Sequence, residues 1–313
     1  MELFKIETGD HVIVQAYSWL TENPLAILQI AHGMMEHARR YDHFARWMNE
    51  HQVAVYANDH IGHGLTAKTP EELSHFPRKD DWQRSVNILH LLNEKIQAEH
   101  PGVAVFLLGH SMGSVMVQTY MMQHGRDADG FILSGAIRQS TLIAGMGLLI
   151  AKMLSALFGP SDRSKLLIFL GYGQYNKKFK PNRTESDWLS SDNSMVDEYI
   201  SSPLCGVPLT SRFYQNFFHG IRFIANHNNL KRIPTEKPVY IIAGQDDPAG
   251  FFGKAPQKIK QLLSKHALAK VDLKLYRAFR HEILNEKNRL VVYGDVLEWI
   301  RETIAHFPLS IEH

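Results

Sequence analysis

Short apolar runs that do not alternate with polar residues recur in both halves of this 313-residue chain, separated by segments of helical periodicity. Strands that are buried on both faces show this uninterrupted pattern, and parallel strands need a helical connection to return the chain. The sequence therefore predicts a mostly parallel sheet with helices on both faces. The predicted strands are residues 25–30, 53–57, 103–108, 130–134, 238–243 and 271–276.

Near the N-terminus the pattern is different. Residues 4–7 and 12–19 are β-rich and flank the turn Thr8-Gly9-Asp10, which predicts an antiparallel hairpin. The helices expected between and after the strands span residues 38–51, 81–99, 111–124, 254–266 and 288–306.

After Ser134 the strand–helix rhythm stops, and no β-like run occurs between residues 139 and 232. The strands on either side of this gap must share one sheet. We therefore predict a core formed by residues 1–138 and 233–313, interrupted by a helical insertion at residues 139–232. This segment is called the insertion below.

The charge and cysteine content narrow the class of protein. Lys and Arg number 34 against 32 Asp and Glu, so a nucleic-acid-binding surface is not expected. The single cysteine, Cys205, excludes an intrachain disulfide and fits a reducing compartment. The N-terminal residues MELFKIETGDHVIV lack the basic start and apolar core of a secretory signal. We expect a cytoplasmic protein.

The pentapeptide Gly109-His110-Ser111-Met112-Gly113 matches the G-x-S-x-G pattern and lies between a predicted strand and a predicted helix. A serine at such a turn adopts a strained backbone that lifts its hydroxyl above the sheet. Ser111 is therefore the predicted nucleophile, and we expect His110 to point away from the reaction and to contribute only packing.

A serine hydroxyl needs a base to take its proton and a carboxylate to orient that base. In hydrolases that carry such a serine at a strand-to-helix turn of a parallel sheet, the order along the chain is serine, acid, histidine. Asp246 and Asp247 follow one of the later predicted strands, and His281 follows the last. The strands that precede these residues end at the same edge of the sheet as the strand that precedes Ser111. The pattern predicts His281 as base and leaves Asp246 and Asp247 as competing acids.

The charge that develops on a substrate carbonyl oxygen needs two backbone N–H donors. One is expected from Met112, the residue after the nucleophile, and the second from the loop that contains His32-Gly33-Met34. Met34 is the predicted second donor.

Five ordered blocks in the sequence are similar to a known group of enzymes: HGMMEHARRYDHFA, DHIGHGLT, GHSMGS, GQDDPAG and FRHEILNE. They resemble the monoglyceride lipase and lysophospholipase group of α/β-hydrolases, also called the serine aminopeptidase S33-like or hydrolase-4 family. The stretch WLSSDNSMVDEYISSPLCGVPLT resembles the cap of that group. The resemblance extends from about residue 27 to 300.

The resemblance implies an α/β-hydrolase fold, with an eight-stranded, mostly parallel sheet and a helical cap inserted after the sixth strand. It implies Asp247 as the acid, His281 as the base and an oxyanion donor directly after Gly33. The DHIGHGLT block departs from the family, which commonly has Arg near His60 or Ile61 and Ser at Thr66. This departure bears on substrate details rather than on the chemistry.

The function expected from these features is hydrolysis of carboxylic esters through an acyl-enzyme, with a small lipophilic substrate such as a monoacylglycerol or lysophospholipid. The resemblance implies no cofactor. A metal is not expected either, because the histidines at 32, 37, 43, 60 and 63 lack a zinc-binding pattern. Head group, acyl length and oligomeric state stay open.

Two other functions remain as alternatives. An aminopeptidase would need carboxylates in the insertion to hold a free amino terminus, for which the candidates are Asp187, Asp192, Asp197 and Glu198. A non-catalytic ligand receptor on the same fold would not need Ser111, Asp247 and His281 together.

Residues 141–158 form an apolar stripe at helical spacing, close to the length of a membrane span. Its glycines, its lysine at Lys152 and its mid-chain position argue against a span. The stripe fits a helix that is buried in a core, or a cap helix that lines an acyl pocket or transiently contacts a membrane surface.

Overall fold

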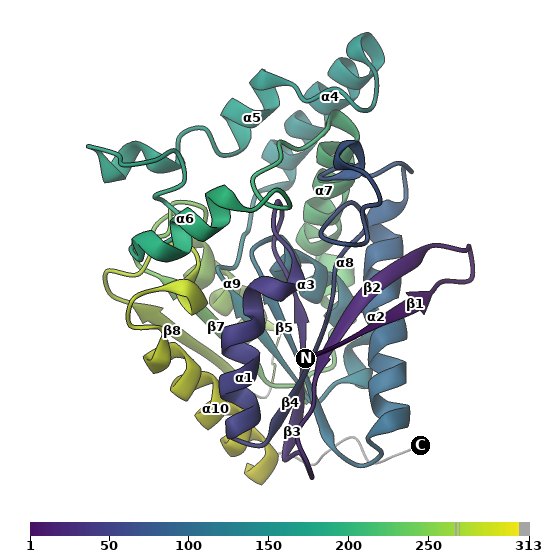
Figure 1. The fold of residues 1–313 in the computed structure, drawn as a ribbon, viewed down its shortest axis with the longest axis vertical. Coiled ribbons are helices and arrows are strands. Elements are labelled where there is room, and N and C mark those ends of the chain that lie inside the picture. The colour runs from purple at the N-terminus through teal and green to yellow at the C-terminus, as the bar shows by residue number, and fades with distance from the viewer. Residues whose placement is uncertain (267, 269, 307–313) are drawn as a thin grey trace.

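The computed structural model describes residues 1–266, 268 and 270–306. In these residues eight strands form one sheet in the order β1-β2-β4-β3-β5-β6-β7-β8 (Figure 1). β1 and β2 are antiparallel to their neighbours, and the remaining strands pair in parallel. The strands are β1 (Glu2–Glu7), β2 (Ile13–Trp19), β3 (Ala26–Ala31), β4 (Val53–Asn58), β5 (Ala104–His110), β6 (Gly130–Ser134), β7 (Val239–Gly244) and β8 (Val271–Tyr276).

Helices cover both faces of the sheet because successive residues of each central strand point to opposite sides. In β5, Val105 and Leu107 pack with α2 (Asp81–Glu99), α3 (Met112–His124) and α9 (Lys254–Lys265). Phe106 and Leu108 pack on the other face, with α1 (Asp42–Glu50) and α10 (Arg289–His306). The sheet thus lies between two apolar layers.

The predicted mostly parallel sheet with helices on both faces is confirmed, and each predicted strand matches an observed one to within two residues. The predicted helices 254–266 and 288–306 each differ by one residue from the observed ones, and two other differences have a structural reason. Residues 38–51 divide into a 3-10 turn, η1 (Ala38–Tyr41), and α1. α3 begins at Met112 because Ser111 has a left-handed φ of 53°, which no α-helix accommodates.

The chain between β6 and β7 is helical, and its first helices lie beyond one end of the sheet (Figure 1). The helices of this segment are α4 (Thr141–Phe158), α5 (Lys165–Gly171), α6 (Asn193–Ser201), α7 (Ser211–Ala225) and α8 (His227–Leu230), with the 3-10 turn η4 (Tyr175–Phe179). Phe213, Phe217 and Ile221 of α7 belong to the apolar layer that contains α3. α7 therefore anchors the insertion, whereas the division into domains at residues 139 and 232 stays a prediction.

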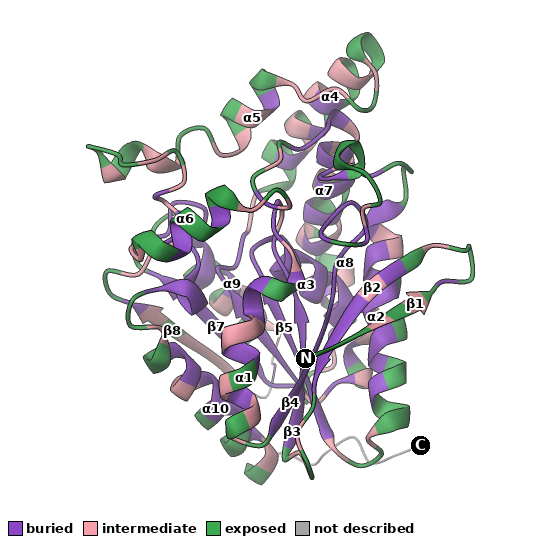
Figure 2. Cartoon of the chain, viewed as in Figure 1, coloured by how far each residue is buried: buried purple, intermediate pink, exposed green. Residues whose placement is uncertain are grey.

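α4 is long and apolar enough to cross a membrane by length and composition, with a mean hydropathy of 1.9. Only 17% of it is buried within the protein, and Figure 2 shows exposed residues along the outer helices of the insertion beside the buried strands. Its buried residues are Ala144, Leu148 and Ala151, which face the rest of the insertion. Most of this apolar helix is therefore surface.

Candidate active site

Ser111 lies in a tight turn between β5 and α3, with φ 53° and ψ −115°. Its N–H donates to the carbonyl of Ser134 at 2.9 Å. A Cβ at Gly109 would lie 2.3 Å from the carbonyl oxygen of Gly113, and one at Gly113 would lie 2.0 Å from that of Ala31. Both positions therefore require glycine, and the strained turn is held by the close approach of backbones that glycine permits.

His281 and Asp247 come from loops that follow β8 and β7 and meet beside this turn. Nδ1 of His281 lies 3.0 Å from Oδ1 of Asp247, and both side chains are buried. Oδ1 of Asp247 also accepts the N–H of Ala249 at 2.8 Å. Asp246 points elsewhere, since its Oδ1 accepts from Nζ of Lys178 at 2.5 Å. Of the two aspartates that the sequence left open, Asp247 is the one in contact with His281.

The imidazole of His281 is buried, which by itself favours its neutral form, but the nearby carboxylates, Asp247 above all, together outweigh the burial. The pKa of His281 is raised above its ordinary value, with smaller contributions from the charges of Glu282 and Glu36. A buried histidine whose imidazolium form is stabilised by a fixed carboxylate is suited to take up a proton and release it again.

The expectation that His110 points away from the site is wrong. His110 lines the same cavity as Ser111, and its ring centroid lies 4.8 Å from that of His281. Burial and the neighbouring His281 lower the pKa of His110 to about 3, so this ring stays neutral. The sharp turn at Ser111 keeps the preceding side chain at the same rim of the sheet.

The loop after β3 lies at the cavity, and the role of Met34 and Met112 as oxyanion donors stays a prediction. Met34 lines the cavity together with Gly33 and Ser111. The N–H of Gly33 is already taken, because it donates to Oε1 of the buried Glu36 at 2.6 Å. Met112 is the first residue of α3, where backbone N–H groups have no partner within the helix. Met34 and Met112 thus lie on the two segments that flank Ser111.

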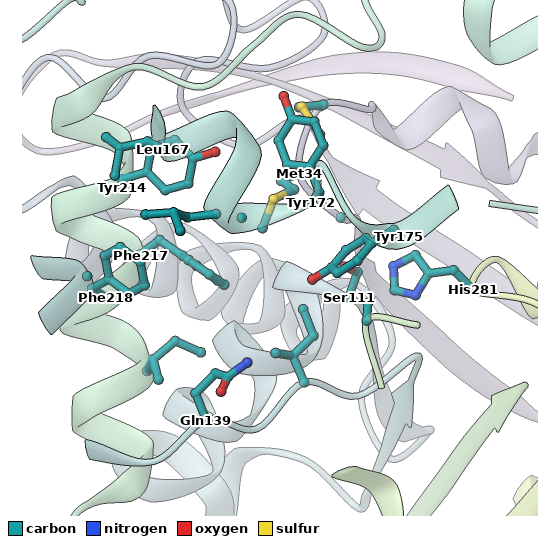
Figure 3. A pocket seen from close by; sticks show the side chains of 18 of the residues that line it. Met34, Ser111, Gln139, Leu167, Tyr172, Tyr175, Tyr214, Phe217, Phe218 and His281 are labelled. Carbon is teal, nitrogen blue, oxygen red and sulfur yellow. The ribbon is translucent and has the colours of Figure 1, made fainter. Parts of the chain in front are cut away.

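A cavity of about 330 Å³ opens above Ser111. Figure 3 shows Ser111, Tyr175 and His281 at one end and Leu167, Tyr214, Phe217 and Phe218 at the other. Its apolar wall is built from α4, α5 and α7, with Ile143, Met146, Ile150, Leu167, Leu170, Phe217 and Phe218 among its lining residues. The sequence predicted an apolar helix at 141–158 but not which of its residues line a cavity.

The four carboxylates of the insertion that were candidates for holding a free amino terminus are placed elsewhere. Among the described residues that line the cavity, Asp187, Asp192, Asp197 and Glu198 do not occur. Asp187 accepts from the backbone and hydroxyl of Thr184, and Asp192 caps α6. Asp197 pairs with Arg183 on the surface. Three of the four candidates therefore have local structural partners.

The histidines at 32, 60 and 63 cluster below the loop of Gly33, with ring centroids 4.0 to 6.3 Å apart. Burial lowers the pKa of His60 to about 3 and that of His63 to about 4, so both are neutral. A different trio, His90, His124 and Asp127, has ligand atoms within 4.8 Å of one another, and it does not line the cavity. The absence of a metal at the active site stays a prediction.

The family model described as serine aminopeptidase, S33 (Hydrolase_4), matches residues 22–288. The chain belongs to this family.

The chain is similar to named relatives and to a solved structure. The chain is 24% identical over 282 residues to the monoacylglycerol lipase of Mycolicibacterium smegmatis, covering 89% of each chain. It is 32% identical to rat monoglyceride lipase over 185 residues. These residues cover 58% of this chain and 52% of the rat protein. A solved carboxyl esterase from Bacillus coagulans, in complex with glycerol, superposes with a TM-score of 0.88 at 27% identity, over 97% of this chain and 98% of that one. The predicted α/β-hydrolase fold and family are confirmed.

One residue of the site was missed by the sequence analysis. Glu36 is buried, lines the cavity and holds the backbone of Gly33. Its signal was present in the block HGMMEH, where an acid follows the glycine by three residues in a segment that was expected to be a loop.

Proposed function

We propose that this protein hydrolyses carboxylic esters of lipophilic acyl groups through an acyl-enzyme on Ser111. The observation that supports the proposal most directly is the buried contact between His281 and Asp247, beside the strained turn of Ser111, at one end of an apolar cavity. Together with a cavity that can hold an acyl chain, these are the parts that nucleophilic acyl transfer needs.

In the proposed mechanism the hydroxyl of Ser111 attacks the ester carbonyl carbon while Nε2 of His281 takes the hydroxyl proton. Nδ1–H of His281 donates to Asp247, which stabilises the imidazolium that forms. The amides of Met34 and Met112 stabilise the charge on the carbonyl oxygen. His281 then returns the proton to the leaving alcohol. Water repeats these steps on the acyl-enzyme and releases the acid.

The substrate class is inferred from the cavity. Its far wall is apolar and its volume is within the range of small-molecule sites, which suits one fatty-acyl chain rather than a charged amino terminus. The named lipases among the relatives act on monoacylglycerols. A monoacylglycerol or a lysophospholipid is therefore the proposed substrate, and the proposed chemistry needs no cofactor.

The outer face of α4 is proposed to contact membrane surfaces transiently. Leu142, Leu149, Met153 and Leu157 are exposed. Ile143, Met146 and Ile150 line the cavity, although Ile143 and Met146 are each also 51% exposed. The helix thus presents one apolar face to the substrate and another to solvent. An exposed apolar face of this kind fits the interface of a lipid bilayer, from which the substrate would come. We propose a cytoplasmic protein that binds membranes peripherally.

The proposal is tested by the rates of hydrolysis of p-nitrophenyl esters from acetyl to palmitoyl, measured beside an aminoacyl anilide. We expect a preference for medium or long acyl esters, and loss of nearly all activity in Ser111→Ala. Preference for the anilide would support an aminopeptidase instead. Equal rates for wild type and Ser111→Ala on every ester would contradict the proposal and favour a ligand receptor.

A further inference from the structure

A buried network of three charged side chains connects the two loops that flank Ser111. Glu36 and Arg40 follow β3 in sequence, and Glu282 directly follows His281. All three are more than nine-tenths buried. Nη1 of Arg40 donates to Oε2 of Glu36 at 2.9 Å and to Oε1 of Glu282 at 2.5 Å. Nη2 of Arg40 donates to Oε2 of Glu282 at 2.8 Å, which completes a bidentate pair.

Each end of the network holds a segment of the active site. Oε1 of Glu36 accepts the N–H of Gly33 at 2.6 Å and the hydroxyl of Tyr41 at 2.9 Å. Glu36 also lies so close to Gly33 that a Cβ there would meet Oε1 at 2.7 Å. At the other end, Oε2 of Glu282 accepts from Nδ2 of Asn285 at 2.8 Å. The position of Gly33 is thus linked through two salt bridges to the backbone next to His281.

The insertion covers this network. The backbone N–H of Glu282 donates to the carbonyl of Leu189 at 2.7 Å, and that of Gly206 donates to the carbonyl of Met35 at 2.9 Å. The ring of Tyr199 lies 4.9 Å from the guanidinium of Arg40. The three charged residues are only 3 to 6% exposed. Charge interactions are stronger in such buried surroundings than in water.

Stability alone is a poor explanation for such a network. Burying three charges carries a desolvation cost that often equals or exceeds their mutual attraction, and apolar replacements of the same volume are often neutral or stabilising. Charged hydrogen bonds do, however, fix atoms in direction and distance. Oxyanion donors and a general base lose most of their effect when they are displaced by about 1 Å.

We propose that Glu36, Arg40 and Glu282 are positioning residues that hold the Gly33–Met34 backbone and the His281 loop at a fixed separation around Ser111. Glu36 occupies the amide of Gly33 and so orients the next amide, that of Met34, toward the substrate oxygen. Arg40 and Glu282 transmit the same constraint to His281. This inference rests on the proposed ester hydrolysis.

The test is Glu36→Gln, which keeps the shape of the side chain but cannot accept from both Gly33 and Arg40. We expect kcat on a p-nitrophenyl ester to fall about 100-fold, with KM changed by less than about threefold. A long-chain alkyl trifluoromethyl ketone, which forms an oxyanion when Ser111 attacks it, should bind about 100-fold more weakly. The chain-matched primary alcohol, which fills the cavity without forming an oxyanion, should bind as it does to wild type.

Asp81→Asn is the matched control. Asp81 is fully buried, pairs with Arg84 and does not line the cavity. Asp81→Asn should lower the free energy of unfolding about as much as Glu36→Gln does. Its kcat and its affinities for the ketone and the alcohol should stay at the wild-type values. If Glu36→Gln keeps wild-type kcat, or weakens the ketone and the alcohol equally, the positioning role is overturned. Failure of wild type to hydrolyse any ester would instead overturn the proposed function.

Tyr41→Phe serves if Glu36→Gln does not fold, since it removes only the hydroxyl that donates to Glu36. We expect the ketone to bind about fivefold more weakly and the alcohol to bind unchanged, which corresponds to loosening one hydrogen bond of the network. Unchanged affinity for both compounds in a folded Tyr41→Phe protein would contradict the proposal.

Discussion

The central sheet and α4 are both strongly apolar, yet the protein uses them in opposite ways. Every residue of β3, β4, β5 and β7 is buried. In α4 most side chains are open to solvent, and Leu142 and Leu157 are 73% and 71% exposed. Figure 2 shows the contrast. Apolar residues of the core pack against one another and support the loops of the site, whereas apolar residues of the insertion line the cavity or are exposed to solvent.

The largest effect is expected where the core fixes the chemistry. Asp247→Asn should lower kcat about 10⁴-fold, because His281 loses its orienting carboxylate. Asp246→Asn, the matched control, should stay within a few-fold of wild type, because Asp246 pairs with Lys178 at the surface. Steady-state kinetics of both variants checks this, and a larger loss in Asp246→Asn would show that the acid has been misassigned.

The same pair predicts a pH dependence. His281 must be neutral to act as a base, and Asp247 raises its pKa above the ordinary value of 6.5. The acid limb of kcat/KM in wild type should therefore lie above pH 6.5. In Asp247→Asn the limb should move to lower pH, because burial then favours the neutral ring without opposition from that carboxylate.

The next prediction tests whether the insertion binds the acyl chain of the substrate. Ile150 of α4 lines the cavity, whereas Leu149 beside it is exposed. Ile150→Trp should lower kcat/KM for palmitoyl relative to butyryl esters about 100-fold, because each excluded methylene loses apolar contact. Leu149→Trp should leave this ratio unchanged. The ratio measured for both variants is the test, and equal effects would mean that the acyl chain does not lie along α4.

Much of the fold was readable from the sequence because the core obeys simple rules. A strand buried on both faces carries an unbroken apolar run, so β6 was located at its observed bounds, residues 130–134. The strand order could not be read, since runs of equal composition do not encode their neighbours. Of the predicted site, Ser111 and His281 followed from strand ends, whereas contact with Asp247 rather than Asp246 depends on side-chain direction within one loop.

The insertion was less readable for a physical reason. Some apolar residues of α4 line the cavity, and others are exposed to solvent. Hydrophobic periodicity alone does not distinguish these residues from those of a buried core helix. Glu36 was missed for a related reason. A buried acid in a loop is recognisable only once its partners Gly33 and Arg40 are known in three dimensions.

A further prediction concerns the stability of the core at acidic pH. The pKa of His63 is lowered to about 4 by burial, from an ordinary value of 6.5. Above pH 6.5 His63 is neutral in both states and contributes nothing to pH dependence. As the pH falls below 6.5 the unfolded chain binds a proton that the folded chain excludes, so stability falls. By pH 5 the loss from His63 alone should be about 2 kcal/mol.

His63→Asn removes this titration, and its side-chain amide can donate to the carbonyl of Ile61 as Nδ1 of His63 does. Urea unfolding at pH 7.5 and pH 5 should show a smaller pH-dependent loss in the variant than in wild type. An identical loss in both proteins would show that His63 does not contribute to acid sensitivity.

The smallest effect is expected on the outer face of α4. Leu142→Gln should reduce partitioning onto phosphatidylcholine vesicles about tenfold, by removing one exposed apolar side chain from the interface, while hydrolysis of a soluble butyryl ester stays unchanged. Leu290→Gln is the control, since Leu290 is similarly exposed but lies on α10 of the core. Partitioning is measured by vesicle sedimentation. Equal partitioning of Leu142→Gln and Leu290→Gln would contradict the proposed contact of α4 with membranes.

The central claim is that an ester acylates Ser111. Rapid quenching of the protein with p-nitrophenyl octanoate, followed by peptide mass mapping, measures this directly. We expect the mass of one octanoyl group on the peptide that contains Ser111 in wild type, and no acylated peptide in Ser111→Ala. Acylation of another residue, or ester hydrolysis at the wild-type rate by Ser111→Ala, would contradict the account.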